Sequence, residues 1–464
     1  MKSRIEKDSL GKKKVPYDRY FGIHTQRSIE TFQVSKKRIN FELFLTITEI
    51  KIAAAKTNME LGLLNKKIGN AIIKACKEIL NGKLNREFVV DIFQAGAGTS
   101  THMNVNEVIA NRAIEILKGK KGDYRLVHPN DHVNMGQSTN DVFPSAIRIS
   151  TYFKLISLIN NLNLLNKELL KKSNEFKAVL KSGRTHLQDA VPMTLGQEFH
   201  AYAYMVEKDI QRIKKTMDFL IKLNIGGNAI GTGINTNVKF KKKIIINLRM
   251  INKVNWKSSE DYISDTQSVT DFLDVSEMLK IIAIDLIKIA NDFRLLSSGP
   301  ITGLKEIKLP AIEPGSSIMP GKINPSIAEM MNMICFQVIG NNEAISYSAQ
   351  AGQLELNVMM PLIAHDLLDS LDILNNGIKI FINKCIIGIK VNKEVCKYYF
   401  EHSMGLATLL NPYIGYDKAS WVVKESLKTG KSISGVVLEK RLLTKDKLDE
   451  IFNIKKIAGT NSNL

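Results

Sequence analysis

The segment from Phe272 to Leu296 places the strongest constraint on how this chain folds. Apolar side chains recur there at alternating steps of three and four residues, at Phe272, Val275, Leu279, Ile282, Leu286, Ile289, Phe293 and Leu296. This spacing is typical of one face of a helix that packs inside a bundle. Ile281 and Ile284 add apolar surface on another side, so we expect the helix to be buried rather than merely amphipathic. We predict a helix over residues 265–296, about 48 Å long at 1.5 Å per residue, which suits the spine of a bundle.

Similar helical spacing occupies four other long windows, at residues 141–176, 194–223, 326–346 and 354–390, and Pro361 is expected to kink the last. No stretch alternates at period two for long enough to predict a strand. Helices that are apolar around much of their circumference cannot bury everything within one chain, so we expect oligomerisation through the bundle. The sequence therefore predicts an all-α fold with an N-terminal helical domain (1–140), a central long-helix bundle (141–390) and a small C-terminal helical domain (391–464).

The net charge of +19 stands out in a composition that is otherwise ordinary for a globular protein. Clustered Lys and Arg would indicate a nucleic-acid-binding protein, which is the non-enzymatic alternative for this chain. The lysines are scattered, however, and no basic stripe carries interleaved aromatic residues. We therefore expect no nucleic-acid partner, and we interpret the positive field as one that would concentrate a dianionic substrate.

Four widely spaced cysteines, Cys76, Cys335, Cys385 and Cys396, form neither Cys-x-x-Cys pairs nor clusters with histidine. This pattern predicts no disulfide framework and no zinc site, and it suits a reducing compartment. Residues 1–14 are polar and lack the apolar stretch of a secretory signal. Because no segment approaches the roughly 20 apolar residues of a membrane span, we expect a cytoplasmic protein with no membrane partner.

The stretch Gly-Ser-Ser-Ile-Met-Pro-Gly-Lys-Ile-Asn-Pro at residues 315–325 interrupts the helical pattern. An ordinary loop between helices would also be rich in Gly, Pro, Ser and Asn. A phosphate-binding loop does not fit, because five residues rather than four separate Gly315 from Gly321, and Ile323 replaces the Ser or Thr that holds magnesium. The functional interpretation is a mobile catalytic loop, in which glycines permit hinge motion and Lys322 with Asn324 can hold a carboxylate.

This loop resembles the signature of the aspartase/fumarase superfamily, a Gly-Ser-Ser-x-Met-Pro-x-Lys-x-Asn pattern. Two further regions resemble segments shared across that family, in the same order. One is Gly-Ala-Gly-Thr-Ser-Thr-His-Met-Asn-Val-Asn-Glu at 96–107; the other joins Gln-Ser-Thr-Asn-Asp at 137–141 with Gly-Arg-Thr-His-Leu-Gln-Asp at 183–189. The similarity runs from about Asp8 to about Phe452. It implies a homotetramer with a twenty-helix core, in which three subunits contribute to each active site.

The resemblance also implies an elimination from a small dicarboxylate, which passes through a carbanion drawn as an aci-carboxylate. Fixed donors around the carboxylate that gains charge would stabilise this carbanion. The implied catalytic residues are Ser316 as general base, His186 and Lys322. The implied substrate-binding residues are Thr101, Ser138, Thr139, Asn140, Thr185, Ser317 and Asn324. Glu329 would orient His186, and no cofactor or metal is expected.

Individual roles follow from the same resemblance. Lys322 and Asn324 would hold the α-carboxylate. The β-carboxylate would lie in a cradle of hydroxyls from Thr101, Ser138, Thr139 and Ser317. The leaving group would face Asn140, Thr185 and His186.

Two branches of the family use the same loop and differ at the leaving group. Residues 20–25, 98–101, 138–140 and 352–359 are closer to aspartases, whereas 313–315 and 414–419 resemble fumarases. The resemblance therefore implies reversible elimination of ammonia from L-aspartate to give fumarate. Hydration of fumarate to L-malate, as in class II fumarases, is the alternative. His102 stands where the family usually carries Asn, and we interpret this as a changed supporting contact beside Thr101.

Overall fold

The computed structural model describes residues 2–458, and the expected mostly helical architecture is confirmed. Contacts divide the chain into two compact units. Unit 1 comprises Met1–Leu158, Arg212–Ile281 and Gln337–Ile373, and unit 2 comprises Ile159–Gln211, Ile282–Phe336 and Leu374–Leu464. The domain boundaries expected after residues 140 and 390 stay a prediction.

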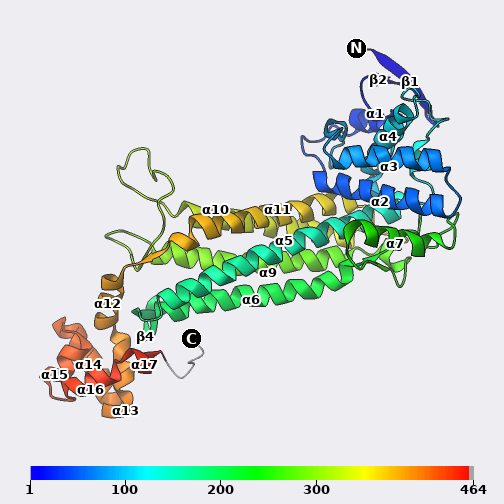
Figure 1. Cartoon of the computed structure of the whole chain (residues 1–464). Coiled ribbons are helices and arrows are strands. Elements are labelled where there is room, and N and C mark those ends of the chain that lie inside the picture. Colours follow the sequence, from blue (N-terminus) through cyan, green and yellow to red (C-terminus); the bar gives the residue numbers. More distant parts are fainter. Residues whose placement is uncertain (1, 459–464) are drawn as a thin grey trace. The chain divides into compact units, whose positions relative to one another are not determined.

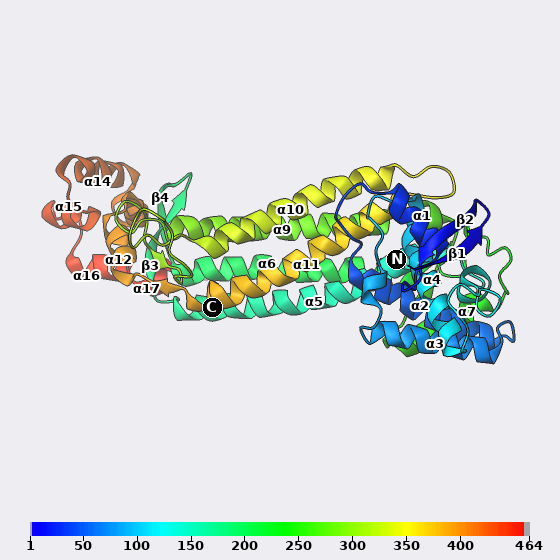
Figure 2. The same ribbon diagram turned by 90° about the horizontal axis from the view of Figure 1, so that it is seen from above.

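Five long helices occupy the predicted helical windows: α5 (Thr139–Glu175), α6 (Leu195–Leu220), α9 (Thr270–Leu296), α10 (Ser326–Gln350) and α11 (Met360–Lys384). Within unit 2 their segments run side by side (Figures 1 and 2). The predicted helix 265–296 begins only at Thr270, because Ser268 is extended and separates it from the short helix α8 (Ser264–Gln267). The kink predicted at Pro361 is wrong. Pro361 lies in the first turn of α11, where a missing N–H costs nothing.

The apolar seam of α9 is buried as predicted, because none of its eight residues is more than 5% exposed. In unit 2, Phe293 of this seam stacks on Phe199 of α6 with ring centroids 5.5 Å apart, and it lies 5.9 Å from Phe381 of α11. The other side of α9 differs from expectation. Ile281 and Ile284 are 37% and 51% exposed, so the single chain leaves this apolar side partly open to solvent.

Unit 1 begins with an antiparallel hairpin of β1 (Ser3–Asp8) and β2 (Gly11–Pro16). Its helical elements are α1 (Ile23–Thr31), α2 (Phe41–Glu60), α3 (Lys66–Leu80), η1 (Asn85–Glu87), η2 (Gly96–Gly98), α4 (Thr99–Ile116), η3 (Pro129–Val133), α7 (Phe240–Asn252) and α8. A short parallel pair joins β5 (Lys222–Leu223) to β6 (Lys257–Ser258). Helix α2 packs against α3, α4 and α7, which places it at the centre of this group (Figure 1).

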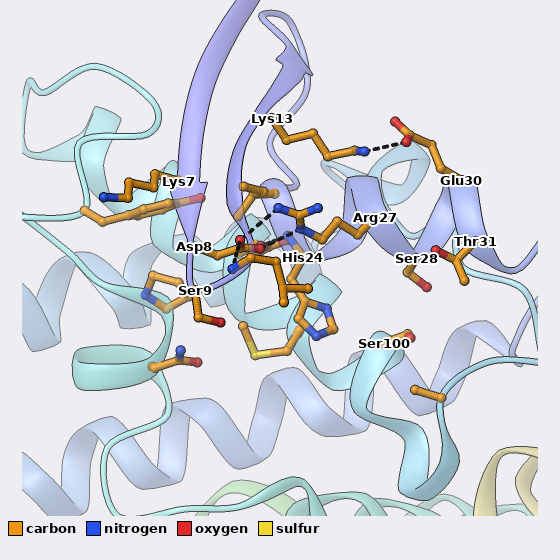
Figure 3. Close-up of a pocket in the computed structure, with 18 of the residues that line it drawn as sticks. Lys7, Asp8, Ser9, Lys13, His24, Arg27, Ser28, Glu30, Thr31 and Ser100 are labelled. Atoms are coloured by element: carbon orange, nitrogen blue, oxygen red, sulfur yellow. Dashed lines mark hydrogen bonds and ion pairs between the residues drawn. The ribbon is translucent and has the colours of Figure 1, made fainter.

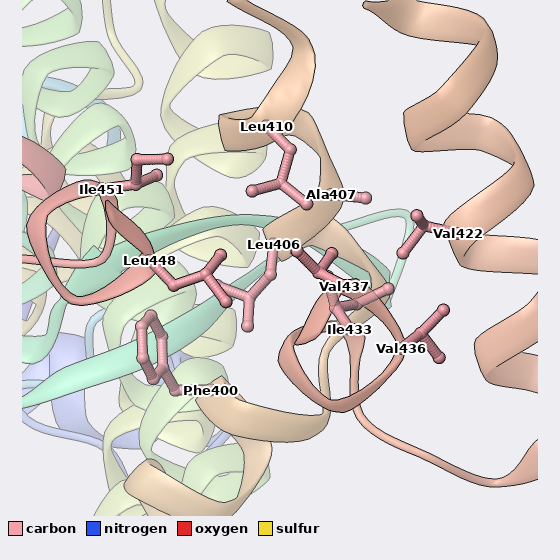
Figure 4. Close-up of a cluster of buried hydrophobic side chains, with 10 residues drawn as sticks. All are labelled: Phe400, Leu406, Ala407, Leu410, Val422, Ile433, Val436, Val437, Leu448 and Ile451. Carbon is pink, nitrogen blue, oxygen red and sulfur yellow. The ribbon is translucent and has the colours of Figure 1, made fainter. Parts of the chain in front are cut away.

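Unit 2 carries a hairpin of β3 (Leu180–Thr185) and β4 (Gln188–Thr194), and a short antiparallel pair of β7 (Ile307–Lys308) and β8 (Lys390–Val391). Its last elements are η4 (Ile386–Gly388), α12 (Lys393–His402), η5 (Met404–Leu410), α13 (Asn411–Ile414), α14 (Tyr416–Thr429), α15 (Ile433–Glu439), α16 (Lys445–Ile451) and α17 (Ile454–Ile457). Ten buried apolar side chains from α12, η5, α14, α15 and α16 converge in one cluster (Figure 4). This small core holds the C-terminal helices together.

The expectation of no strands is therefore wrong for the two hairpins. Few apolar residues alternate in β1 and β2, which are rich in charged residues, mostly Lys. The β3–β4 turn consists of His186 and Leu187, rather than the Asn-Gly or Asp-Gly that usually indicates a two-residue hairpin turn. Neither hairpin thus carries the pattern on which strand prediction depends.

Helix α5 passes the length and composition test for a membrane span, contrary to the expectation that no segment would. It does so alone among the helices of residues 2–458. Its most apolar window has a mean hydropathy of 1.3, and 72% of that window is buried within the protein. A helix in a protein core has the same composition, and this burial accounts for the apolar character of α5.

Candidate active site

The residues Ser138-Thr139-Asn140 lie at the N-terminus of α5, where a capping box fixes them. The Ser138 hydroxyl accepts the N–H of Asn140 at 3.2 Å, and the Asp141 carboxylate accepts the N–H of Ser138 at 2.9 Å. Asp141 is buried and also accepts two backbone N–H groups from the loop at 226–228. The remaining N–H groups of the first turn and the helix dipole favour an anion at this end of α5.

The segment from Gly98 to Thr101 starts α4. Gly98 has φ 88°, and a Cβ there would lie 2.4 Å from the ring of Phe143, so the tight entry to the helix requires glycine. Thr101 is fully buried, and its N–H and hydroxyl both donate to the Gln94 side-chain oxygen, at 2.8 and 2.9 Å. Its predicted role in the β-carboxylate cradle is therefore difficult to fulfil in this conformation. Thr99, the first residue of α4, is only half-buried and is better placed for a ligand.

A chain of hydrogen bonds joins these two helix N-termini. His102 Nδ1 lies 2.8 Å from the Thr139 hydroxyl oxygen, and His102 Nε2 lies 2.6 Å from Lys51 Nζ. Burial lowers the pKa of Lys51 to about 7, and burial beside Lys51 keeps the pKa of His102 well below its usual value. The structure thus brings the motif at 99–102 together with that at 138–140. Our sequence reasoning missed Lys51, although it lies one helical turn from Ile47 on a buried face of α2.

A cavity of about 850 Å³ opens in unit 1 beside the start of α4. It is lined by residues of β1, β2, α1, α4 and η3. Two ion pairs, Asp8–Arg27 and Lys13–Glu30, form part of this lining (Figure 3). Among the described residues, three buried polar atoms of its lining have no hydrogen-bond partner: His24 Nδ1, Ser28 Oγ and Ser100 Oγ. None of the predicted site residues lines this cavity, although Ser100 directly precedes Thr101.

In unit 2, Thr185 and His186 lie at the exposed turn of the β3–β4 hairpin. His186 and Leu187 have φ values of 54° and 58°, which for residues other than glycine is strained backbone of the kind found at functional sites. The base of β3 is anchored by buried charges. Glu306 is fully buried and lies 2.8 Å from both Lys181 and Arg184. These ion pairs fix β3, which ends at Thr185 just before His186.

The loop at 315–325 folds on itself in unit 2. The N–H of Gly315 donates to the Lys322 carbonyl at 2.8 Å, and the Asn324 amide donates to the Gly315 carbonyl at 2.8 Å. The Ser316 hydroxyl accepts the N–H groups of Ile318 and Met319, at 3.2 and 2.9 Å. The side chains of Ser317 and Lys322 are exposed, so they are free to contact another molecule.

Among residues 2–458 of the single chain, no hydrogen bond or ion pair joins Glu329 to His186, and their predicted pairing stays a prediction. Glu329 lies in the first turn of α10 and is half-buried. The same described residues contain no group of three or more His, Cys, Asp or Glu side chains that could hold a metal ion.

Comparison with known proteins places this architecture in a family. Residues 11–340 match the family described as "Lyase", and residues 406–459 match "Fumarase C C-terminus". The aspartate ammonia-lyases of Bacillus subtilis and Escherichia coli are 46% and 45% identical to this chain over 97% and 98% of its length, covering 95% and 96% of theirs.

Solved structures agree with these relatives. A fumarate lyase:delta crystallin from Brucella melitensis bound to cobalt is 42% identical with a TM-score of 0.95, over 98% of this chain and 100% of that one. A class II fumarase from Schistosoma mansoni is 39% identical with a TM-score of 0.94, over 99% of this chain and 100% of that one. The resemblance inferred from the loop and the two further motifs is thereby confirmed, and the chain belongs to the lyase family that contains the aspartases and fumarases.

Proposed function

We propose that this chain is an aspartate ammonia-lyase, which eliminates ammonia reversibly from L-aspartate to give fumarate. The observation that carries the proposal is the likeness to relatives of that name, at 45–46% identity over 97–99% of the chain. The segments at 98–101 and 138–140, which resemble aspartases, lie at the joined N-termini of α4 and α5. Two helix N-termini rich in hydroxyls suit a dicarboxylate.

The proposed reaction removes a proton from the β-carbon, after which the C–N bonding pair leaves with ammonia. The β-carboxylate gains negative charge in the intermediate, so it requires donors already in place. Ser138 suits this task, because its oxygen accepts a backbone N–H and its proton remains available to a ligand. Thr139, in the same first turn, is the second hydroxyl of the cradle. Thr185, His186 and Asn140 would face the departing ammonia, with Glu329 orienting His186.

Ser316 is the proposed base that takes the β-carbon proton. Its oxygen accepts two backbone N–H groups, and such bonds favour the ionised hydroxyl that a serine base needs. Lys322 and Asn324 are proposed to hold the α-carboxylate, and Ser317 to join the cradle. Because the Asn324 amide donates to the Gly315 carbonyl, we infer that the loop rearranges when substrate binds.

We further propose a homotetramer in which residues of separate copies complete each active site. The apolar side chains on α9 and α10 support it, since Ile284, Met333 and Phe336 are 51%, 64% and 58% exposed in the single chain. Thr185, His186, Ser317 and Lys322 are also exposed, which leaves them accessible to another copy. We place the enzyme in the cytoplasm, in keeping with four free, buried cysteines.

Fumarate hydration is the second candidate, favoured by the "Fumarase C C-terminus" match and the likeness to the class II fumarase. The deciding experiment follows fumarate absorbance with L-aspartate or L-malate as substrate. We expect fumarate to form from L-aspartate. Formation from L-malate alone would assign the chain to the fumarases, and no product from either would refute both candidates.

A further inference from the structure

Lys51 is an unusual residue for the core of unit 1. It is fully buried on α2, and each of its three ammonium hydrogens has an uncharged acceptor. The acceptors are His102 Nε2 at 2.6 Å, the Asn134 side-chain oxygen at 2.8 Å and the Gln137 side-chain oxygen at 3.0 Å. A lysine without a bonded carboxylate is costly to bury, so its position calls for a reason other than stability.

The ammonium group determines how the hydrogens of His102 are arranged. A neutral imidazole has one nitrogen that donates and one that accepts. Lys51 donates to Nε2, so Nε2 accepts and Nδ1 carries the hydrogen. The Nδ1 hydrogen then points at the Thr139 oxygen, 2.8 Å away. Thr139 consequently accepts from His102, and its own hydroxyl hydrogen is directed elsewhere.

We propose that Lys51 and His102 are positioning residues that direct the Thr139 hydroxyl hydrogen toward a carboxylate bound at the N-terminus of α5. This inference rests on the proposed function, in which Thr139 belongs to the β-carboxylate cradle. The order of donation is Lys51 to His102, His102 to Thr139, and Thr139 to the ligand. Without the cation, His102 could carry its hydrogen on Nε2, and Thr139 would then donate to Nδ1 and turn its hydrogen away from the ligand.

The surroundings keep this direction fixed. The Gln137 amide donates to the Val133 and Met135 carbonyls, so its side-chain oxygen must face Lys51. The Asn134 amide donates to the Gln137 carbonyl, with the same result for its own oxygen. Both acceptors are therefore oriented by backbone carbonyls, and they hold Lys51 as a donor.

Deprotonation of Lys51 would reverse the order. A neutral Lys51 amine has two hydrogens, which it donates to Asn134 and Gln137. Its lone pair then accepts the hydrogen of His102 Nε2. Nδ1 of His102 is left without a hydrogen and accepts one from the Thr139 hydroxyl. The ionisable groups that act on the pair are Asp141 of α5 and Cys76 of α3 on Lys51, and His24 of α1 on His102. Turnover should therefore fall as Lys51 loses its proton, while binding of the opposite carboxylate by Lys322 persists.

A double-mutant cycle on the intact enzyme tests the inference. Lys51→Met and Thr139→Val are made singly and together, and kcat and KM are measured with L-aspartate at a pH below 7, where Lys51 keeps its proton. We expect Thr139→Val to lower kcat about 100-fold and Lys51→Met about tenfold or more, with smaller changes in KM, because the donor acts where charge develops. In the Thr139→Val background Lys51→Met should have no further effect on kcat. An equal loss in both backgrounds would overturn the inference.

Two controls separate positioning from general damage. Lys172→Met removes another buried lysine, which donates to the Ile389 carbonyl in unit 2, and it should leave kcat unchanged. If Lys51→Met is insoluble, His102→Phe breaks the same chain and should show the same non-additivity with Thr139→Val. Additive losses there would count against the inference.

A readout independent of activity distinguishes this inference from the proposed function. Neutron diffraction on ligand-free crystals held at a pH below 7, where Lys51 keeps its proton, locates deuterium on His102, and we expect it on Nδ1 and not on Nε2. Deuterium on Nε2 would refute the inference even in an active lyase. Deuterium on Nδ1 in a protein that does not act on L-aspartate would support the hydrogen-bond order and refute the proposed function instead.

Discussion

The protonation of individual side chains in this protein depends on their burial and on their hydrogen-bond partners. Lys51 lies in the core with its three donors satisfied, whereas Ser316 lies in an exposed loop with two amides aimed at its oxygen. In the first case burial disfavours the charged form; in the second, hydrogen bonds favour it. These opposite environments make separate predictions.

The first prediction concerns Lys51 and pH. Its folded-state pKa of about 7 lies below the usual value of 10.5, so between these values the unfolded chain binds more protons than the folded protein. This group therefore makes stability rise with pH above 7, by about 2 kcal/mol from pH 7 to pH 9. Melting temperatures at these two pH values should rise less for Lys51→Met than for the wild type. An identical rise in both proteins would show that Lys51 is charged throughout.

The second prediction concerns Ser316. Ser316→Ala removes the oxygen proposed to take the substrate proton, so turnover of L-aspartate should fall to background. The amides of Ile318 and Met319 lose an acceptor but lie in an exposed loop, where water replaces it at little cost. Light scattering should therefore give an unchanged molar mass. Turnover near the wild-type rate would remove Ser316 from the mechanism.

At this scale the sequence predicts which residues are candidates for the site, and their roles stay predictions, but it does not predict the hydrogen-bonding state of each side chain. The three motifs located Ser138, Thr139, Ser316 and Lys322 because their residue order is distinctive. The same motifs could not indicate that the hydroxyl of Thr101 is bonded to Gln94, which depends on the fold of the η2 turn. The sequence did not indicate a role for Lys51, because the long side chain of a lone lysine in an apolar helix is usually expected to reach solvent.

At the scale of elements, the helices can be predicted from the sequence, whereas the β3–β4 hairpin cannot. The spacing of three and four residues in α9 follows from helix geometry, so burial of that face preserves the pattern. The hairpin depends on a two-residue turn with positive φ at both positions, which His186 and Leu187 adopt against their preference. We infer that this turn is kept for the place it gives His186.

The third prediction tests the strain in that turn. Leu187 is 69% exposed, so Leu187→Gly loses little packing and relieves the left-handed conformation. It should raise stability by about 0.5–1 kcal/mol, measured as a higher melting temperature. Val191→Gly is the matched control, because Val191 is also exposed but lies in β4, where glycine should lower stability. Equal losses from both variants would mean that the turn is unstrained.

At the scale of the whole molecule, the apolar surface of α9 and α10 calls for a partner. The fourth prediction is that Phe336→Glu, on the exposed side of α10, breaks the proposed homotetramer because it places a charge in a desolvated contact. Light scattering after gel filtration should show smaller particles. Leu427→Glu, at an apolar position of α14 that is 69% exposed, should leave the mass unchanged. A tetramer that survives Phe336→Glu would place the subunit contacts elsewhere.

Four of the proposed site residues are exposed to solvent in the single chain: Thr185, His186, Ser317 and Lys322. This exposure affects how enzyme activity depends on the concentration of the chain. If a single polypeptide is inactive until it assembles with other copies, then at low expression total enzyme activity rises more steeply than the concentration of the protein. By the same reasoning, mixed assemblies of two defective alleles, one altered at Ser316 and one at Thr139, would contain some fully equipped centres. Such partial restoration in a heterozygous cell would be a genetic signature of a shared catalytic centre.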